Sequence, residues 1–223
     1  LLLDEVMAGL RPTETNMPSH VWLQKFGGGA APADGSYLTG GYLGMVSLRD
    51  GVFNKCVAEL PADLRDSPLV RAAWQGIDAT KVLDTHCHVF GDGDSGSGLW
   101  FNPNLEQIWR PRGYVQREFY VNASCVDETP GKVDLSFVQR LLAQSRGMAS
   151  GFQVLLFGFD WAHDDAGAKL PERSTFYVPD AYVASLAAAH PTHFRWAASI
   201  HPYDPRALDR LDAAVAQGTR AIK

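Results

Sequence analysis

From residue 82 onward, the hydrophobic positions follow a pattern in which short apolar runs alternate with longer amphipathic stretches. The apolar runs have the length and composition of strands, and they occupy residues 82–88, 153–159, 194–200 and 219–223. The stretches between them carry apolar residues at helical spacing, bounded by Asp, Pro and Gly, at residues 133–147, 179–190 and 204–218. This alternation predicts parallel strands that are connected by helical crossovers, as in α/β folds.

The two best-defined helices carry specific expectations about their ends and their buried faces. In the first, Asp134 is expected to cap the N-terminus and Gly147 to end the helix. In the second, Asp204 is expected to be the cap and Gly218 the stop. The positions of the second helix that are expected to face inward are Leu208, Leu211 and Val215.

Residues 1–80 lack this alternation and are expected to form an N-terminal extension. Residues 27–44 are rich in glycine, a composition that favours a loop. Two strand-like runs within 45–57 are joined by an Asp-Gly dipeptide, which suits a tight hairpin turn. Residues 66–76 then predict a short helix that is capped by Ser67 or by the residue before it.

Composition and charge narrow the classes of protein to consider. A chain of 223 residues that is 46% hydrophobic can bury a sizeable core, as one domain or as a domain with an appendage. A net charge of −5 without a run of basic residues argues against a nucleic-acid or anionic-membrane surface. No apolar segment approaches the ~20 residues that a membrane-spanning helix needs, and no signal peptide is visible.

The three cysteines, Cys56, Cys87 and Cys125, are odd in number and far apart in the sequence. This spacing argues against a disulfide framework and favours a reducing compartment. A cytoplasmic location is therefore expected.

The first predicted strand ends in Asp84-Thr85-His86-Cys87-His88. Residues two apart in a strand point to the same face, so His86 and His88 are expected to project side by side, with Cys87 on the opposite face as core packing. Asp84 would share the face of the histidines, where it could orient an imidazole or cap a turn. Two parallel imidazoles at the end of an apolar strand favour a metal site over surface or core histidines.

Polar residues also follow the other predicted strands. Asp160 and His163 come after the second strand, His201 after the third, and Lys223 after the fourth. The C-terminal strand ends of parallel α/β folds converge on the ligand site, so these side chains are candidates for it. His201 is expected either to line the pocket or to brace the turn before Pro202, and Asp160 and His163 are expected to be loop residues around the site.

The segment between the first two strands is predicted to be rich in loops, with a helix near residues 113–121. Its run Asp-Gly-Asp-Ser-Gly-Ser at 92–97 has the composition of a calcium-binding loop but lacks the downstream acidic ligand. A flexible loop is therefore expected there.

The motifs LDTHCH, SIHPYDP and GTRAIK, at the first, third and fourth predicted strands, together resemble the amidohydrolase superfamily, particularly its amidohydrolase-related (amidohydrolase-2) branch. The resemblance covers residues 80–223 and leaves residues 1–80 unexplained. It implies an α/β fold of the (β/α)8 TIM-barrel type, with about the first four βα units in residues 81–223. Because the chain begins without Met and stops within a predicted strand, it is expected to be the N-terminal part of such a barrel.

The resemblance also implies a divalent metal, usually Zn²⁺, bound as one or two ions at the C-terminal mouth of the barrel. Carried over to this chain, His86 and His88 would be the first metal ligands. Members with two metals bridge them through a carboxylated lysine at the end of strand four, where Lys223 falls; the alternative is a pocket lysine. Lys223 and His201 are the candidate catalytic residues, and the remaining ligands would lie beyond Lys223.

The reaction that the resemblance implies is hydrolysis of a C–N or C–O bond of a small molecule through a metal-activated water. The alternatives are a non-oxidative decarboxylase or lyase of the same superfamily, a PHP-type phosphoesterase, and a non-catalytic barrel with a structural metal site. A small-molecule substrate is expected, with no nucleic-acid or membrane partner. An uncovered edge of half a barrel also predicts self-association into a homo-oligomer.

Overall fold

The computed structural model describes residue 56 and residues 62–223. The predicted glycine-rich loop and nearly all of the predicted hairpin lie outside the described residues. The domain boundary predicted at residue 80 therefore stays a prediction.

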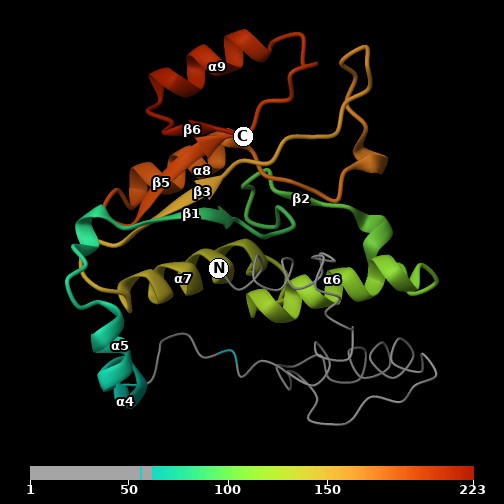
Figure 1. Cartoon of the computed structure of the whole chain (residues 1–223). Coiled ribbons are helices and arrows are strands. Elements are labelled where there is room, and N and C mark those ends of the chain that lie inside the picture. The colour runs from blue at the N-terminus through green and yellow to red at the C-terminus, as the bar shows by residue number, and fades with distance from the viewer. Residues whose placement is uncertain (1–55, 57–61) are drawn as a thin grey trace, which may run out of the picture. The chain divides into compact units, whose positions relative to one another are not determined.

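The larger of two compact units comprises Val57–Asn102 and Val126–Lys223. Its centre is a four-stranded parallel sheet with the strand order β1-β3-β5-β6. These strands are β1 (Leu83–His88), β3 (Gln153–Phe157), β5 (Phe194–Ala198) and β6 (Ala221–Ile222). The sheet curls into half a barrel (Figure 1), so the prediction of a parallel α/β fold is confirmed at this level.

Three helices alternate with these strands along the chain, as predicted: α7 (Val133–Arg146), α8 (Asp180–Ala189) and α9 (Ala207–Ala216). Shorter elements complete the unit: α4 (Ala62–Arg65), α5 (Pro68–Ala73), η1 (Ala79–Lys81), β2 (Trp100–Phe101), η3 (Pro171–Arg173) and β4 (Phe176–Tyr177). The hydroxyl of Ser67 accepts a hydrogen bond from the amide of Val70, which confirms Ser67 as the cap of α5. Within the described residues, no helix has the length and apolar character needed to span a bilayer.

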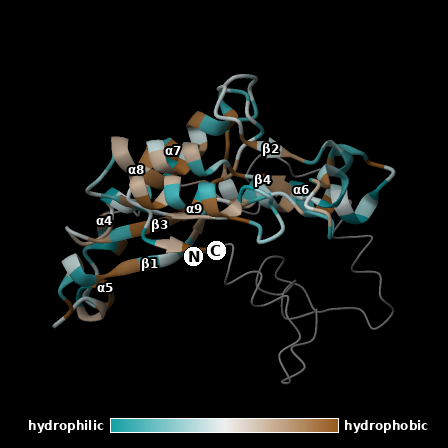
Figure 2. Cartoon of the chain, turned by 90° about the horizontal axis from the view of Figure 1, so that it is seen from above, coloured by the Kyte–Doolittle hydropathy of each residue, from teal (hydrophilic) through white to brown (hydrophobic). Residues whose placement is uncertain are grey.

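The core of this unit lies between the sheet and helices α7 and α8. Leu156 in β3 and Phe194 in β5 are fully buried, and Phe137 of α7 and Val183 of α8 belong to the same apolar cluster. Figure 2 shows that these helices carry both hydrophobic and hydrophilic positions, as helices that cover a sheet on one face do. The uninterrupted apolar run of β3 reflects a strand covered on both faces.

Helix α9 differs from the prediction in its start and in its buried face. It begins at Ala207, and Asp204 lies before it, where its carboxylate accepts a hydrogen bond from the amide two residues later. Leu208 and Val215, expected to face inward, are 77% and 61% exposed, so the prediction is wrong for these two residues, whereas Leu211 is half-buried. The less exposed face of α9 consists of Ala207, Arg210, Leu211 and Ala214, of which Ala214 is buried and the other three are half-buried.

The N-terminus of α7 is capped by a residue that lies far away in the sequence. Asp94 accepts hydrogen bonds from the amides of Val133 and Asp134 at 2.9 and 3.2 Å, so the prediction that Asp134 is the cap is wrong. The buried carboxylate of Asp134 instead accepts hydrogen bonds from the 92–97 loop, donated by the amides of Asp92, Gly93 and Ser95 and the hydroxyls of Ser95 and Ser97. The two aspartates hold loop and helix together, in contrast to the flexible loop that was predicted.

The smaller unit comprises Leu1–Cys56 and Pro103–Cys125, of which Cys56 and the second segment are described. It contains η2 (Pro103–Glu106) and α6 (Pro111–Ser124), which extends the helix predicted near residues 113–121 at both ends. Cys56 and Cys125 form a disulfide with Cα atoms 5.4 Å apart, so the prediction against a disulfide is wrong. The prediction failed because cysteines that are far apart in the sequence can be close in the folded chain. The reducing compartment was inferred from unpaired cysteines, so that inference no longer holds.

Candidate metal centre

His86 and His88 project from the C-terminal end of β1 on the same side of the strand, as predicted. Their Nε2 atoms lie 3.2 Å apart and their ring centroids 5.1 Å apart. The carboxylate of Asp84 accepts a hydrogen bond from the amide of His86 at 3.1 Å, which fixes the backbone at this point. Cys87 packs against the apolar core, as expected for the residue between them.

The spacing of the two imidazole nitrogens fits a shared ion. Two histidine nitrogens that bind one tetrahedral Zn²⁺ at ~2.0–2.1 Å are separated by ~3.3 Å. The observed 3.2 Å between the Nε2 atoms of His86 and His88 is close to that separation. This separation is compatible with two ligands of one metal ion, and it is also the distance of a hydrogen bond between the two rings.

Lys223 follows β6, at the opposite edge of the sheet from β1. The outer strands of a flat four-stranded sheet would lie ~14 Å apart. Lys223 Nζ nevertheless lies 3.1 Å from His88 Nε2, because the curl of the sheet brings the ends of β1 and β6 toward each other (Figure 1). The structure thus brings together three of the four predicted site residues.

The surroundings of His88 are aromatic. The rings of Phe157, Phe159 and Phe176 lie 5.7, 5.4 and 5.8 Å from the His88 ring, centroid to centroid. Lys223 Nζ lies 5.0 and 4.8 Å from the centroids of Phe157 and Phe159. The nitrogen atoms of the site therefore lie against an apolar wall that is built from the end of β3 and from β4.

This environment keeps His88 neutral. The pKa of His88 is lowered to about 3. Burial is the largest cause, and the positive charges of Lys223 and His86 contribute less. Because an ammonium group only donates hydrogen bonds, His88 Nε2 accepts from Lys223 and the ring proton resides on Nδ1. That tautomer directs the Nε2 lone pair into the site, as metal binding through Nε2 requires. His88 Nδ1 is buried and has no hydrogen-bond partner within the described part of the chain.

His201, the fourth predicted residue, belongs to a different cluster. Its ring lies 4.5 Å from that of His163, centroid to centroid, and its Nδ1 accepts a hydrogen bond from the amide of Tyr203 at 3.2 Å. Its own amide donates to Asp160 at 2.9 Å. Of the two roles predicted for His201, these hydrogen bonds are those of a residue that braces a turn.

Arg210 on α9 organises this second cluster. Its guanidinium donates to the carboxylates of Asp160, Asp204 and Asp180 at 2.6, 2.8 and 3.2 Å, and to the carbonyl of Ser199 at 3.0 Å. Asp160, His163 and Asp204 lie close enough together to hold a metal ion. The carboxylates of Asp160 and Asp204 already accept hydrogen bonds from Arg210, so the arrangement serves to hold the loops after β3 and β5.

Sequence reasoning did not identify Arg210. No motif surrounds it, and its three acidic partners come from separate loops and a helix start. The recurrence of polar residues at strand ends pointed to Asp160, and the helix pattern pointed to Asp204 as a cap, but neither pattern pointed to Arg210.

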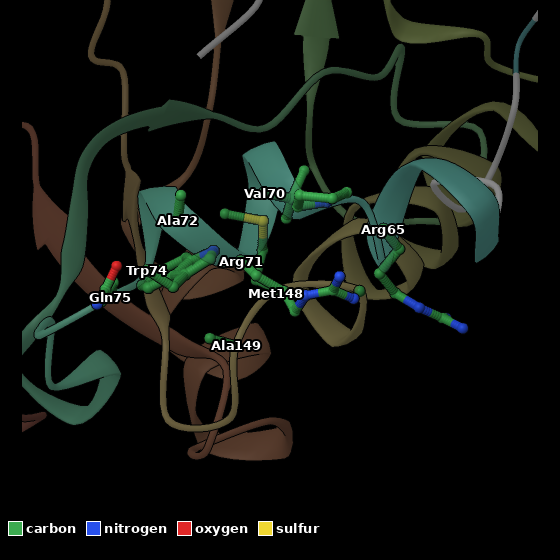
Figure 3. Close-up of a pocket in the computed structure, with 10 residues that line it drawn as sticks. Arg65, Val70, Arg71, Ala72, Trp74, Gln75, Met148 and Ala149 are labelled. Carbon is green, nitrogen blue, oxygen red and sulfur yellow. The ribbon is translucent and has the colours of Figure 1, made fainter.

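A shallow cavity of about 720 Å³ lies at the other end of the sheet (Figure 3). It is lined by residues of α4, α5 and the turn after α7, among them Arg65, Arg71, Trp74 and Met148. Trp74 contacts Phe152, which directly precedes β3, at a centroid distance of 6.3 Å. The cavity therefore lies near the N-terminal strand ends, away from the histidines.

Comparison with known proteins adds no information about this site. No family model, curated protein or solved structure matches the chain.

Proposed function

We propose that the protein is a metal-dependent hydrolase that acts on a C–N or C–O bond of a small molecule through a metal-activated water. The observation that carries the proposal is the convergence of His86 Nε2, His88 Nε2 and Lys223 Nζ, with separations of 3.2 and 3.1 Å, at the C-terminal end of the sheet. Parallel α/β sheets bind their ligands at this end.

His86 and His88 are the residues that would hold the ion, and Zn²⁺ suits a pair of neutral imidazole donors best. A bound Zn²⁺ lowers the pKa of a water to ~7 and polarises the carbonyl under attack. Because neutral imidazoles add no negative charge, the ion keeps its full charge for this purpose.

Other residues of the chain would shape and support the site. Phe157, Phe159 and Phe176 exclude water from one side of the His88 imidazole. Asp84 fixes the backbone of the first ligand. Arg210 holds the loops beyond β3 and β5. A curled sheet of four parallel strands is compatible with the first half of a (β/α)8 barrel, and we include that architecture in the proposal.

The test is Zn²⁺ binding, measured by titration against a chromophoric chelator. We expect the wild-type protein to bind Zn²⁺, and the double variant His86→Ala, His88→Ala to lose both Zn²⁺ binding and hydrolytic activity. His190→Ala, a histidine at the end of α8, is the matched control and should retain both. Full zinc stoichiometry in the double variant would contradict the proposal.

A substrate screen separates hydrolysis from the alternative lyase chemistry. Amides, esters and lactones are assayed for hydrolysis, and carboxylates are assayed for release of carbon dioxide. Metal-dependent hydrolysis supports the proposal, whereas metal-dependent release of carbon dioxide without hydrolysis would assign the site to a decarboxylase.

A further inference from the structure

The lone pair on His88 Nε2 is needed by two different cations. In the structure it accepts the hydrogen bond from the Lys223 ammonium at 3.1 Å. A neutral imidazole has one nitrogen lone pair in the plane of its ring, and a metal that coordinates Nε2 needs that same lone pair. The other ring nitrogen of His88 is buried and carries the proton. Lys223 and a metal ion therefore cannot both use His88.

We propose that Lys223 is an internal competitor for the metal: its ammonium binds His88 Nε2 when the ion is absent and has to leave when the ion binds. This inference rests on the metal site proposed above. It concerns the regulation of that site, namely how tightly the ion is held.

The contacts of Lys223 are those of a bound cation. Its Nζ lies over the rings of Phe159 and Phe157 at 4.8 and 5.0 Å, an arrangement that favours the charged ammonium over the neutral amine. A protonated amine has no lone pair to offer a metal, so Lys223 in this state is not a ligand. The ammonium engages the same His88 lone pair that a metal ion would use.

The backbone allows the side chain to move without disturbing the sheet. The amide of Lys223 donates to the carbonyl of Ala198 at 2.8 Å, and the carbonyl of Lys223 accepts from the amide of Ile200 at 3.4 Å. The side chain is exposed, and its four-carbon stem is flexible. The ammonium can therefore swing away from His88 while β6 stays paired with β5.

The test is the dissociation constant for Zn²⁺, measured by competition with a chromophoric chelator. Lys223→Met removes the competing charge and its donors while it keeps the length of the side chain. We expect this variant to bind Zn²⁺ at least about tenfold more tightly than the wild-type protein, which corresponds to the loss of one charge-assisted hydrogen bond. Lys223→Arg keeps the charge and should stay close to the wild type. Lys169→Met, on an exposed loop, is the control for a general change of surface charge.

A second readout follows the lysine itself. Saturation with Zn²⁺ should increase the rate at which acetic anhydride modifies Lys223, measured by mass spectrometry, because the released amine is no longer engaged by His88. An unchanged or lower rate would contradict the displacement.

The outcomes separate this inference from the proposed function. If the wild type and Lys223→Met bind Zn²⁺ equally, the competition is overturned and the hydrolase proposal stands. Weaker binding by Lys223→Met also overturns it, because lysine would then act as a ligand or a carboxylated bridge. If neither protein binds Zn²⁺, both proposals fail.

Discussion

At the scale of single residues, Arg210 forms ion pairs with three carboxylates at once. Its guanidinium faces three carboxylates, those of Asp160, Asp180 and Asp204, and the side chains of Asp160 and Asp204 are each only 5% exposed. Burial raises the pKa of Asp180, and the positive charge of Arg210 counteracts this effect. Without the guanidinium, three neighbouring carboxylates would repel one another in a poorly hydrated region.

We therefore predict that Arg210→Met strongly destabilises the protein, by about 3–5 kcal/mol, because it leaves buried carboxylates without their partner. The measurement is the free energy of unfolding in urea at neutral pH. Arg206→Met, an exposed arginine one turn earlier, should change stability by less than about 1 kcal/mol. Equal effects of the two substitutions would show that the network contributes no more than a surface charge.

At the scale of elements, the start of α7 and the 92–97 loop form one structural unit. Asp94 caps the helix from the loop, and Asp134 organises the loop from the helix. Burial raises the pKa of Asp134, but hydrogen bonds from Ser97, Ser95 and the amide of Gly93 outweigh this effect and leave the pKa below its ordinary value. The ionised carboxylate is therefore the form that stabilises the fold.

This direction sets the pH dependence of the loop. Because the pKa of Asp134 is lower in the folded than in the unfolded chain, its contribution is complete above the unfolded value of ~3.9 and is lost as pH falls through the folded value. Asp134→Asn should cost about 2–4 kcal/mol at pH 7 and reduce the fall in stability between pH ~5 and ~2. Urea unfolding across this pH range measures both effects, with the exposed Asp165→Asn as control. A variant with an unchanged pH profile would refute the assignment.

At the scale of the whole molecule, apolar side chains of the larger unit are exposed on the two edge strands of the sheet and on α9. In the described part of the chain, β1 and β6 are the edge strands, and Leu83 and Ile222 on them are 37% and 48% exposed. Leu208 on α9 adds a side chain that is 77% exposed. Open edges with apolar side chains favour pairing with another chain.

We predict concentration-dependent self-association of this 223-residue chain in sedimentation equilibrium. Leu208→Glu combined with Val215→Glu should weaken it, because the two charges would have to be buried at the contact. Leu135→Glu, on the exposed side of α7, is the matched control and should have little effect. A monomer at all concentrations would rule out association through this face.

The helices and strands were predictable where the hydrophobic pattern of the sequence matches the face that the element buries in the fold. The apolar run of β3 and the alternation of strands with helices predict the parallel sheet, because period and length distinguish the two element types. The cap of α5 was predictable, because Ser67 is adjacent to the helix in the sequence. The cap of α7 was not, because Asp94 and Val133 meet only after the chain folds. The inward face of α9 was predicted correctly only at Leu211, because the buried face is rotated from Leu208 and Val215 toward Arg210 and Ala214, and the contacts of Arg210 form only after the chain folds.

The sequence by itself determined that His86 and His88 project together, because residues two apart in a strand share a face. Only the tertiary structure decided that Lys223 meets them, since this contact depends on the curl of the sheet between its two edges. It also decided that the His201 ring accepts a hydrogen bond within its own turn and that Arg210 joins two loops and the start of α8. Contacts between residues far apart in sequence depend on how the chain packs, and no local pattern encodes them.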